Sequence, residues 1–198
     1  SQFGTDNTDR KELANVSLQY AKQMCQALKN YDSQINQLAE GVKLDAQTSV
    51  DKVNSILEEI YRVNDQIKNA YVSSGDIIVD STQDNGYKAN TEYGPNELKD
   101  QLNELVDELS TYGNVDMTEN ADGTYNVDFA NHSAVTSNET FRQLEIKYDE
   151  NDGSMQLFFN DGNQITADEQ NLASGALRGY LDMYNGGGVY AAELGKGY

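Results

Sequence analysis

Apolar and small side chains recur at helical spacing through the first third of the chain. The positions are Leu13, Val16, Tyr20, Met24, Leu28, Tyr31, Ile35, Leu38, Val42, Ala46, Val50, Val53, Leu57, Ile60, Ile67 and Tyr71, with polar Asn64 filling one slot beside Val63. The mean step of about 3.6 residues matches a straight α-helix, whereas a coiled coil needs a strict step of about 3.5. The pattern predicts one helix over residues 9–71, roughly 90 Å long. Gly41 is its weak point, where a bend is easiest, because glycine costs about 1 kcal/mol relative to alanine in a helix.

A second helical pattern covers residues 95–112. Its apolar stripe consists of Leu98, Leu102, Leu105, Leu109 and Tyr112. Pro95 suits the first helical position, where its missing N–H costs nothing, and Gly94 is the expected N-cap. Gly113 is the expected C-terminal stop. This helix is only about 27 Å long, so it is too short to cover the long stripe, and much of that stripe must pack against something else.

Five carboxylates crowd the segment NELKDQLNELVDEL within the second helix. They are Glu97, Asp100, Glu104, Asp107 and Glu108. Paired acids occur in catalytic and metal sites, but no histidine or tight loop of oxygen ligands lies near these. Because they fall beside and opposite the apolar stripe, we interpret them as the solvated flank of a helix. Glu97 is favourably placed near the positive end of the helix dipole.

The hydrophobic period changes from 3.6 to 2 in the middle of the chain. The segments VDMTENADGTYNVDF and LEIKYDENDGSMQLFF alternate around Asp122-Gly123 and Asp152-Gly153, and Asp161-Gly162 marks a further turn. The pattern predicts a small antiparallel sheet of four or five strands over residues 114–166, which needs a neighbour to pack on. The segment DENDG fails the EF-hand pattern, since Gly153 takes the place of the third ligand. We expect ANHSAVTSNET to be a loop.

The remaining segments complete an α+β fold. LASGALRGYLDMYNGGG predicts a short helix at about residues 174–185, and the link at 72–94 is expected to be a loop or a short hairpin. The expected organisation is a helical rod domain at 1–113, a small antiparallel β domain at 114–166, and a return to the helical domain with a tail at 167–198.

Charge and hydropathy exclude several classes of partner. The formal net charge is −19, from 33 acidic and 14 basic residues. Such a surface repels the phosphates of nucleic acids and of anionic membranes, so we expect neither as a partner. The apolar runs are only a few residues long, too short to span a bilayer, and no cleavable signal peptide is visible.

Cys25 is the only cysteine and His132 the only histidine. No disulfide forms within such a chain, and we expect Cys25 to be a small packed residue of the long helix. A zinc site of ordinary type needs more histidine or cysteine ligands. A Cys–His pair is conceivable only if the helix meets the distant loop that holds His132. A serine nucleophile with this histidine stays open, although the sequence has no G-x-S-x-G, phosphate-loop or dinucleotide motif.

Three segments, taken in order, resemble a known family. They are VDKVNSILEEIYRVNDQI, then NELKDQLNELVDELSTYGNV running into DMTENADGTYNVDF, and finally SGALRGYLDMYNG. Over roughly residues 10–186 the chain is similar to the flagellar hook-associated protein 1 family, the hook–filament junction proteins of bacterial flagella. The residues that fall on the family's motifs are Asp100, Gln101, Leu105, Asp107, Glu108, Leu109, Gly175, Leu177, Leu181 and Asp182. Leu102 and Asn103 depart from the arginine and aspartate that the family usually has.

This resemblance implies a structural role with no catalysis and no cofactor. The chain would be the central part of a longer subunit, whose absent terminal segments form further helices that bundle with the central ones. The implied partners are the flagellar hook protein, the second hook–filament junction protein and copies of itself in a ring. A cytoplasmic export chaperone would hold the missing C-terminal segment. Such subunits leave the cell through flagellar type III export and become extracellular parts of the flagellum, and the motif residues would serve packing and assembly.

Two other functions compete with the structural one. A secreted coiled-coil surface protein or adhesin would show the same long amphipathic helix, and its terminal sequence would distinguish it. A glycoside hydrolase needs two acids flanking a cleft, and nothing in these helices or hairpins predicts a cleft. For the isolated chain we expect a monomer.

Overall fold

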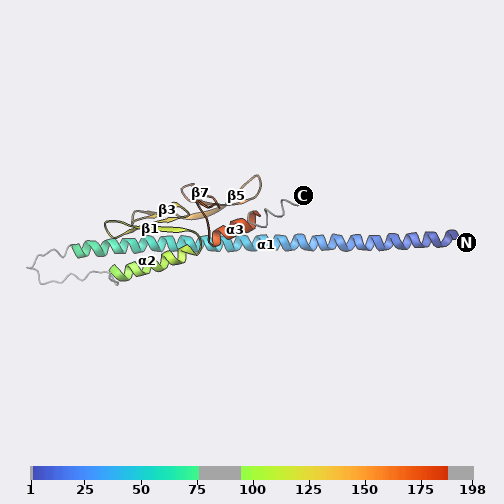
Figure 1. Cartoon of the computed structure of the whole chain (residues 1–198), viewed down its shortest axis with the longest axis horizontal. Coiled ribbons are helices and arrows are strands. Elements are labelled where there is room, and N and C mark those ends of the chain that lie inside the picture. The colour runs from blue at the N-terminus through green and yellow to red at the C-terminus, as the bar shows by residue number, and fades with distance from the viewer. Residues whose placement is uncertain (1, 76–94, 187–198) are drawn as a thin grey trace, which may run out of the picture. The chain divides into compact units, whose positions relative to one another are not determined.

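The computed structural model describes residues 2–75 and 95–186. Its elements are α1 Gln2–Gly75, α2 Pro95–Ser110, β1 Val115–Glu119, β2 Tyr125–Phe129, β3 His132–Thr136, β4 Thr140–Phe141, β5 Leu144–Tyr148, β6 Met155–Phe159, β7 Gln164–Ile165 and α3 Ala176–Asn185 (Figure 1). A long helix with small antiparallel sheets confirms the predicted α+β class. Most of the predicted link, residues 76–94, lies outside the described residues, and so does the tail after residue 186.

The chain divides into two compact units, residues 1–42 and residues 43–198. We call them the N-terminal unit and the C-terminal unit. Helix α1 contributes to both units, and its helical assignment includes Gly41 without a break. The described part of the N-terminal unit consists of α1. In the C-terminal unit, α1, α2, α3 and the strands share one hydrophobic core.

Seven strands form two sheets in the described part of the C-terminal unit. Sheet A has the order β1-β2-β3-β4 and sheet B the order β5-β6-β7, with antiparallel pairing throughout. The prediction of a single sheet with four or five strands is therefore wrong. Strands β3 and β4 lie largely within ANHSAVTSNET, so the expectation that this segment is a loop is wrong. Ala130 and Asn131 have φ of 50° and 60°, values typical of a type I′ hairpin turn, so His132 begins strand β3.

The three predicted Asp-Gly turns are present, and each contains a hydrogen bond of the same type. In each turn the aspartate Oδ1 accepts the backbone N–H two residues on: Asp122 from Thr124, Asp152 from Ser154, and Asp161 from Asn163. The glycine between them has a positive φ each time, of 77°, 72° and 90°. Aspartate favours this local bond and glycine adopts a positive φ without strain. The segment DENDG is accordingly the hairpin turn between β5 and β6.

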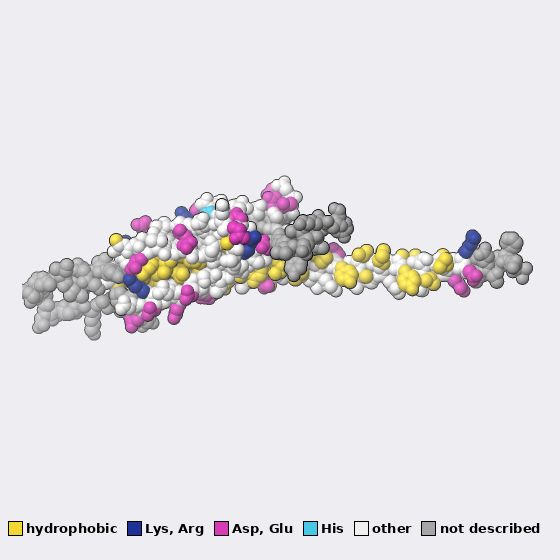
Figure 2. All heavy atoms as spheres, in the orientation of Figure 1, with side chains coloured by type: hydrophobic (Ala, Val, Ile, Leu, Met, Phe, Trp, Pro, Cys, Tyr) yellow, Lys and Arg dark blue, Asp and Glu magenta, His cyan; other side chains and the backbone are white. Residues whose placement is uncertain are grey.

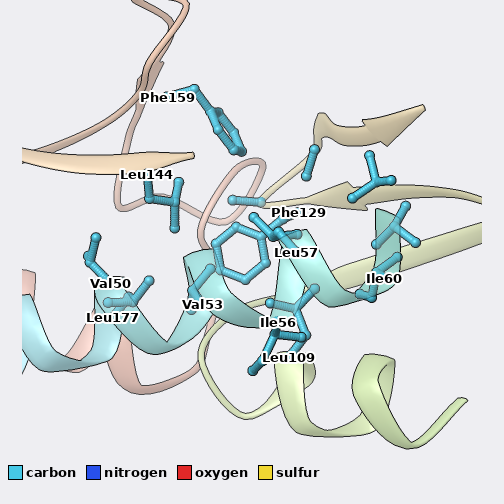
Figure 3. Close-up of a cluster of buried hydrophobic side chains, with 14 of the residues drawn as sticks. Val50, Val53, Ile56, Leu57, Ile60, Leu109, Phe129, Leu144, Phe159 and Leu177 are labelled. Carbon is cyan, nitrogen blue, oxygen red and sulfur yellow. The ribbon is translucent and has the colours of Figure 1, made fainter. Parts of the chain in front are cut away.

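The core of the C-terminal unit lies around the second part of α1. Its largest fully buried side chains are Phe129, Phe159, Leu57, Ile60, Ile67, Leu98, Leu102, Leu109, Leu157, Ile165, Leu172 and Val50. Figure 3 shows part of this core, where Leu57, Phe129 and Phe159 are labelled. The Lys52–Glu108 ion pair joins α1 to α2, and a bond from the Asn54 amide to the Leu144 carbonyl joins α1 to sheet B. Within this unit, α1 is therefore covered by α2 on one side and by the sheets on another (Figure 1).

Helix α2 ends at Ser110, two residues before the predicted end. The N–H groups of Thr111 and Tyr112 bond to the carbonyls three residues back, which tightens the chain after the helix. Gly113 does not have a positive φ, so its predicted role as a left-handed helix stop is wrong. Packing explains the glycine instead, because an added Cβ would lie 2.6 Å from the Phe129 ring.

Candidate assembly surface and helix junction

The N-terminal unit carries a continuous apolar face on α1. Every side chain from residue 9 to residue 38 is exposed. The large apolar ones on this face are Leu13, Val16, Tyr20, Met24, Leu28, Tyr31, Ile35 and Leu38, with exposed fractions from 46% to 69%. Leu18 is also exposed but lies on another side of the helix at 100° per residue. Figure 2 shows these hydrophobic side chains gathered along the helix. An apolar face of this length is a candidate interaction surface, because monomeric soluble proteins rarely expose large contiguous apolar patches. We call it the exposed stripe.

The motif residues of α2 divide into a buried and an exposed set. Leu109 is fully buried and Leu105 packs partly buried against the core. Gln101 reaches α1 through a bond of 3.5 Å from its amide to Glu59 Oε1. Glu108 pairs with Lys52 of α1 at 2.9 Å. The carboxylates of Asp100 and Asp107 lie on the exposed side of the helix, where they form the predicted solvated flank.

Leu102 and Asn103 are the two positions that depart from the family motif. The Leu102 side chain is fully buried, whereas Asn103 is exposed. A leucine at this place on the apolar stripe contributes its full side-chain burial to the core, which favours folding by roughly 1.5–3 kcal/mol. Leu102 therefore serves the hydrophobic core of the C-terminal unit.

The motif residues of α3 lie at a junction between two helices that are far apart in sequence. The N–H of Ala176 bonds to the carbonyl of Thr111 at 3.0 Å, and the N–H of Leu177 bonds to the carbonyl of Tyr112 at 3.1 Å. The first two N–H groups of α3 thus bond to two carbonyls that directly follow the end of α2. Both sets would otherwise lack partners, since helix ends leave such groups unpaired. The whole β region is inserted between the two halves of this junction.

Gly175 is the residue that allows the junction to close. Its φ is 94°, and an added Cβ would lie 2.5 Å from backbone atoms of Tyr112 and Gly113. Leu177 and Leu181 then enter the core. Asp182 accepts a bond of 2.8 Å from Arg178, whose guanidinium also donates to the Leu172 carbonyl. The later motif therefore combines a close backbone approach, two core leucines and an ion pair.

No group of three or more His, Cys, Asp or Glu side chains within the described ranges could hold a metal ion. His132 bonds through Nδ1 to the Ala130 carbonyl at 2.7 Å. Its ring centroid lies 6.0 Å from that of Phe159, with the two rings tilted by 47°. Cys25 is free and exposed on α1, so the expectation that it is packed is wrong for this chain. No described helix is both long and apolar enough to cross a membrane.

Charged side chains in the C-terminal unit act locally. The hydrogen bond from Lys99 to Glu119, 2.7 Å long, lowers the pKa of that carboxyl. The hydrogen bond and charge of Glu108 raise the pKa of Lys52. The Thr124 hydroxyl lowers the pKa of Asp122. Each shift favours the form that is already charged at neutral pH, so none of these groups is poised for proton transfer.

Three asparagines that the sequence analysis did not select hold the helices to the sheets. They are Asn54 and Asn64 on α1 and Asn185 at the end of α3. Asn64 had one visible signal, since it is the polar slot in an otherwise apolar stripe. Asn54 and Asn185 lie off any such pattern, and their backbone partners are distant in sequence.

Comparisons with known proteins identify the family. Flagellar hook-associated protein 1 of Escherichia coli (strain K12) is 31% identical over 159 residues, which are 79% of this chain and 25% of that protein. The chain thus spans about a quarter of the length of this curated relative. The solved flagellar hook junction protein FlgK from Burkholderia pseudomallei is 20% identical, with a TM-score of 0.42, over 74% of this chain and 26% of that one. Residues 4–195 match the family described as the flagellar hook-associated protein FlgK helical domain, and the chain belongs to this family.

Proposed function

We propose that this protein is a structural subunit of the bacterial flagellum that joins the hook to the filament and performs no catalysis. The observation that carries the proposal is the family match over residues 4–195, together with a relative whose printed name is flagellar hook-associated protein 1. The exposed stripe supports it, because a scaffold subunit works through extended surfaces. The proposed location is extracellular, on the flagellum, after type III export without a cleavable signal.

The exposed stripe is proposed to pack against further helices of the full-length subunit. The relative has about four times the length that this chain matches, so a full-length subunit offers ample chain to cover the stripe. Burial of apolar surface stabilises such packing by roughly 25 cal/mol per Å². The proposed organisation is a helical domain at residues 1–113 and 167–198 with a β domain at 114–166 inserted.

The proposed partners follow from the family. They are the flagellar hook protein, the second hook–filament junction protein and copies of the same subunit in a ring, with an export chaperone that binds a C-terminal segment beyond this chain. The motif residues are proposed to act in packing and assembly. Leu109, Leu177 and Leu181 would hold the core, and the exposed acids of α2 would keep that face hydrated.

Deletion of the full-length gene in its motile host tests the proposed function. We expect cells with bare hooks and flagellin lost to the medium, as seen by negative-stain electron microscopy and by immunoblotting of the medium. Complementation with the intact gene should restore filaments. Normal filaments on swimming cells would contradict the hook–filament role and would favour the alternative function, a secreted surface adhesin.

Cysteine accessibility tests the covering of the stripe. In a Cys25→Ser background, Met24→Cys places a thiol on the exposed stripe, and Lys22→Cys places the matched control about 160° around the helix at 100° per residue. In the 198-residue chain both thiols should react quickly with a maleimide, since both residues are exposed. In the full-length subunit, with any other cysteine replaced by serine, the thiol at position 24 should be protected and the thiol at 22 should stay reactive. Equal reactivity in the full-length subunit would exclude a covered stripe.

A further inference from the structure

Three helix asparagines each bind both polar groups of one backbone residue. Asn54 Oδ1 accepts the N–H of Leu144 at 2.6 Å, and its Nδ2 donates to the Leu144 carbonyl at 2.9 Å. Asn64 binds Tyr125 in the same way, with both distances 2.8 Å. Asn185 binds Met155 at 2.8 and 2.9 Å. Because an antiparallel strand neighbour exchanges the same two bonds with its partner, each asparagine amide takes the place of one strand residue.

Each of the three backbone partners is the first residue of its strand. Tyr125 is the first residue of β2, Leu144 the first of β5, and Met155 the first of β6. Two of the asparagines come from α1 and one from α3. Sheet A is thus attached to α1 through Asn64, and sheet B is attached to α1 through Asn54 and to α3 through Asn185.

Asn64 is the most deeply placed of the three. It is fully buried in the middle of the apolar stripe of α1. The Nδ2 group of Asn64 also donates a second hydrogen bond, 2.9 Å long, to the carbonyl of Ser137. Ser137 has a φ of 51°, which non-glycine residues adopt rarely. Its hydroxyl contacts the buried Thr124 hydroxyl at 2.7 Å.

The neighbours of Asn64 on α1 extend this attachment. Lys68 donates to Asn138 Oδ1 at 3.1 Å, and Asn138 donates to Asp65 Oδ1 at the same distance. Lys68 Nζ also lies 3.8 Å from Asp122 Oδ2. One turn of helix therefore holds both the β1–β2 turn and the residues that follow β3.

Such an attachment permits one alignment of helix and sheet. If α1 shifted by one residue along a sheet, the asparagine would rotate by about 100° and leave the backbone groups of the strand. Apolar packing alone tolerates such shifts better, because hydrophobic contact has no direction. A buried backbone group that loses its partner is costly. A single buried asparagine fixes register in coiled coils on the same principle.

We propose that Asn54, Asn64 and Asn185 are register locks, each of which fixes one helix against the first residue of one strand. Each lock acts on its own strand, within the hydrophobic core that both sheets share. Asn64 fixes sheet A, Asn54 fixes the start of β5, and Asn185 fixes α3 against β6.

Asparagine-to-aspartate substitutions in the 198-residue chain test this proposal, because aspartate keeps the shape and the acceptor but loses the amide donor. Gln66→Glu is the matched control: it also turns a side-chain amide into a carboxylate and adds the same charge to α1, two residues after Asn64, at an exposed position. The readout is amide hydrogen exchange, resolved by segment, under conditions where exchange reports opening equilibria.

The expected result is a different local pattern for each variant. Asn64→Asp should lower protection about tenfold or more in β2 and at the end of β3, and leave β5 and β6 close to the parent. Asn54→Asp should affect the start of β5, and Asn185→Asp should affect β6 and α3, with sheet A unchanged in both. If Asn64→Asp does not fold, the other two variants decide. A uniform loss over both sheets, or the same profile as Gln66→Glu, would overturn the proposal.

Discussion

Residues 9–38 and residues 46–70 of α1 have the same apolar spacing but opposite environments. In the first region the stripe is exposed throughout. In the second, the positions on the stripe are buried, from Ala46 and Val50 through Val53, Leu57, Ile60 and Ile67 to Ala70. The comparison teaches that periodicity identifies the face of a helix that needs a partner. It does not show whether that partner lies within the same chain.

The second region is covered because elements distant in sequence return to it. Its cover begins near Lys43, whose Nζ lies 5.3 Å from the ring centroid of Tyr148 and 5.6 Å from that of Tyr184. Those rings come from the end of β5 and from α3, and they lie edge to face. A lysine between two aromatic rings is held by cation–π attraction as well as by contact of its alkyl chain.

The largest expected effect separates the two regions directly. Leu57→Ala removes a fully buried side chain and should lower the free energy of unfolding by about 2–5 kcal/mol. Leu28→Ala makes the same change on the exposed stripe and should alter it by about 0.5 kcal/mol or less. Urea unfolding followed by circular dichroism measures both. Similar losses for the two variants would mean that the stripe is buried in solution, as in a dimer of this chain.

Breaking the α2–α3 junction should weaken the cover of the second region. Gly175→Ala introduces a Cβ 2.5 Å from the backbone of Tyr112 and Gly113 at a positive φ. The backbone strain alone should destabilise the chain by about 1–3 kcal/mol, and the clash should add to it. Gly179→Ala is the matched control in the same helix, because nothing lies within 4 Å of its new Cβ.

The two glycine variants should therefore differ in sign. Gly179→Ala should stabilise the chain by up to about 1 kcal/mol, since alanine is the better helix former. Thermal unfolding of the two variants beside the parent gives the comparison. A Gly175→Ala variant as stable as the parent would show that the close approach of α3 to α2 is dispensable.

The sequence predicted the parts of this fold that depend on local chemistry. The stripe of α2 was identified from leucine spacing, and three hairpin turns were identified from Asp-Gly pairs that both permit and stabilise the turn. The strands β3 and β4 were missed, because Ala130-Asn131 is a weak turn signal and the flanking residues are polar. The exposure of Cys25 was missed for another reason: a helical pattern does not reveal whether its partner is present.

The residues of the α2–α3 junction show more clearly what a sequence pattern cannot predict. Gly175 and Leu177 were selected through a family resemblance, but their physical role depends on carbonyls more than sixty residues earlier in the sequence. Gly113 was noticed and given the wrong role, since a glycine after a helix is usually a left-handed stop. Its actual constraint is the Phe129 ring, which no local pattern reports.

A smaller effect is expected where the exposed region of α1 ends, at Gly41. Gly41→Ala places a Cβ where nothing lies within 4 Å, inside a continuous helix. It should strengthen the helix locally by about 1 kcal/mol without touching the core of the C-terminal unit. Amide exchange around residue 41 should slow, and exchange of the sheet amides should stay unchanged. Faster exchange near residue 41 would mean that the chain needs glycine there for a bend.

The smallest expected effect is a loss of stability at low pH that arises from one carboxyl of the C-terminal unit. The Thr166 hydroxyl, followed by the backbone N–H and side-chain amide of Asn171, lowers the pKa of Asp168 well below its ordinary value of 3.8. A carboxyl with a lowered pKa in the folded state adds stability above its unfolded pKa and loses that contribution as pH falls through the folded value. Asp168 lies in the loop between β7 and α3, within the C-terminal unit.

Asp168→Asn keeps an acceptor in this loop but removes the titration. Above about pH 5 the parent should be the more stable chain, and the two urea midpoints should converge as the pH is lowered from about 4 to 2. The exposed neighbour variant Glu169→Gln should follow the parent over this range. A gap between parent and Asp168→Asn that widens with acid would contradict the assigned direction, and the loop would then favour the protonated carboxyl.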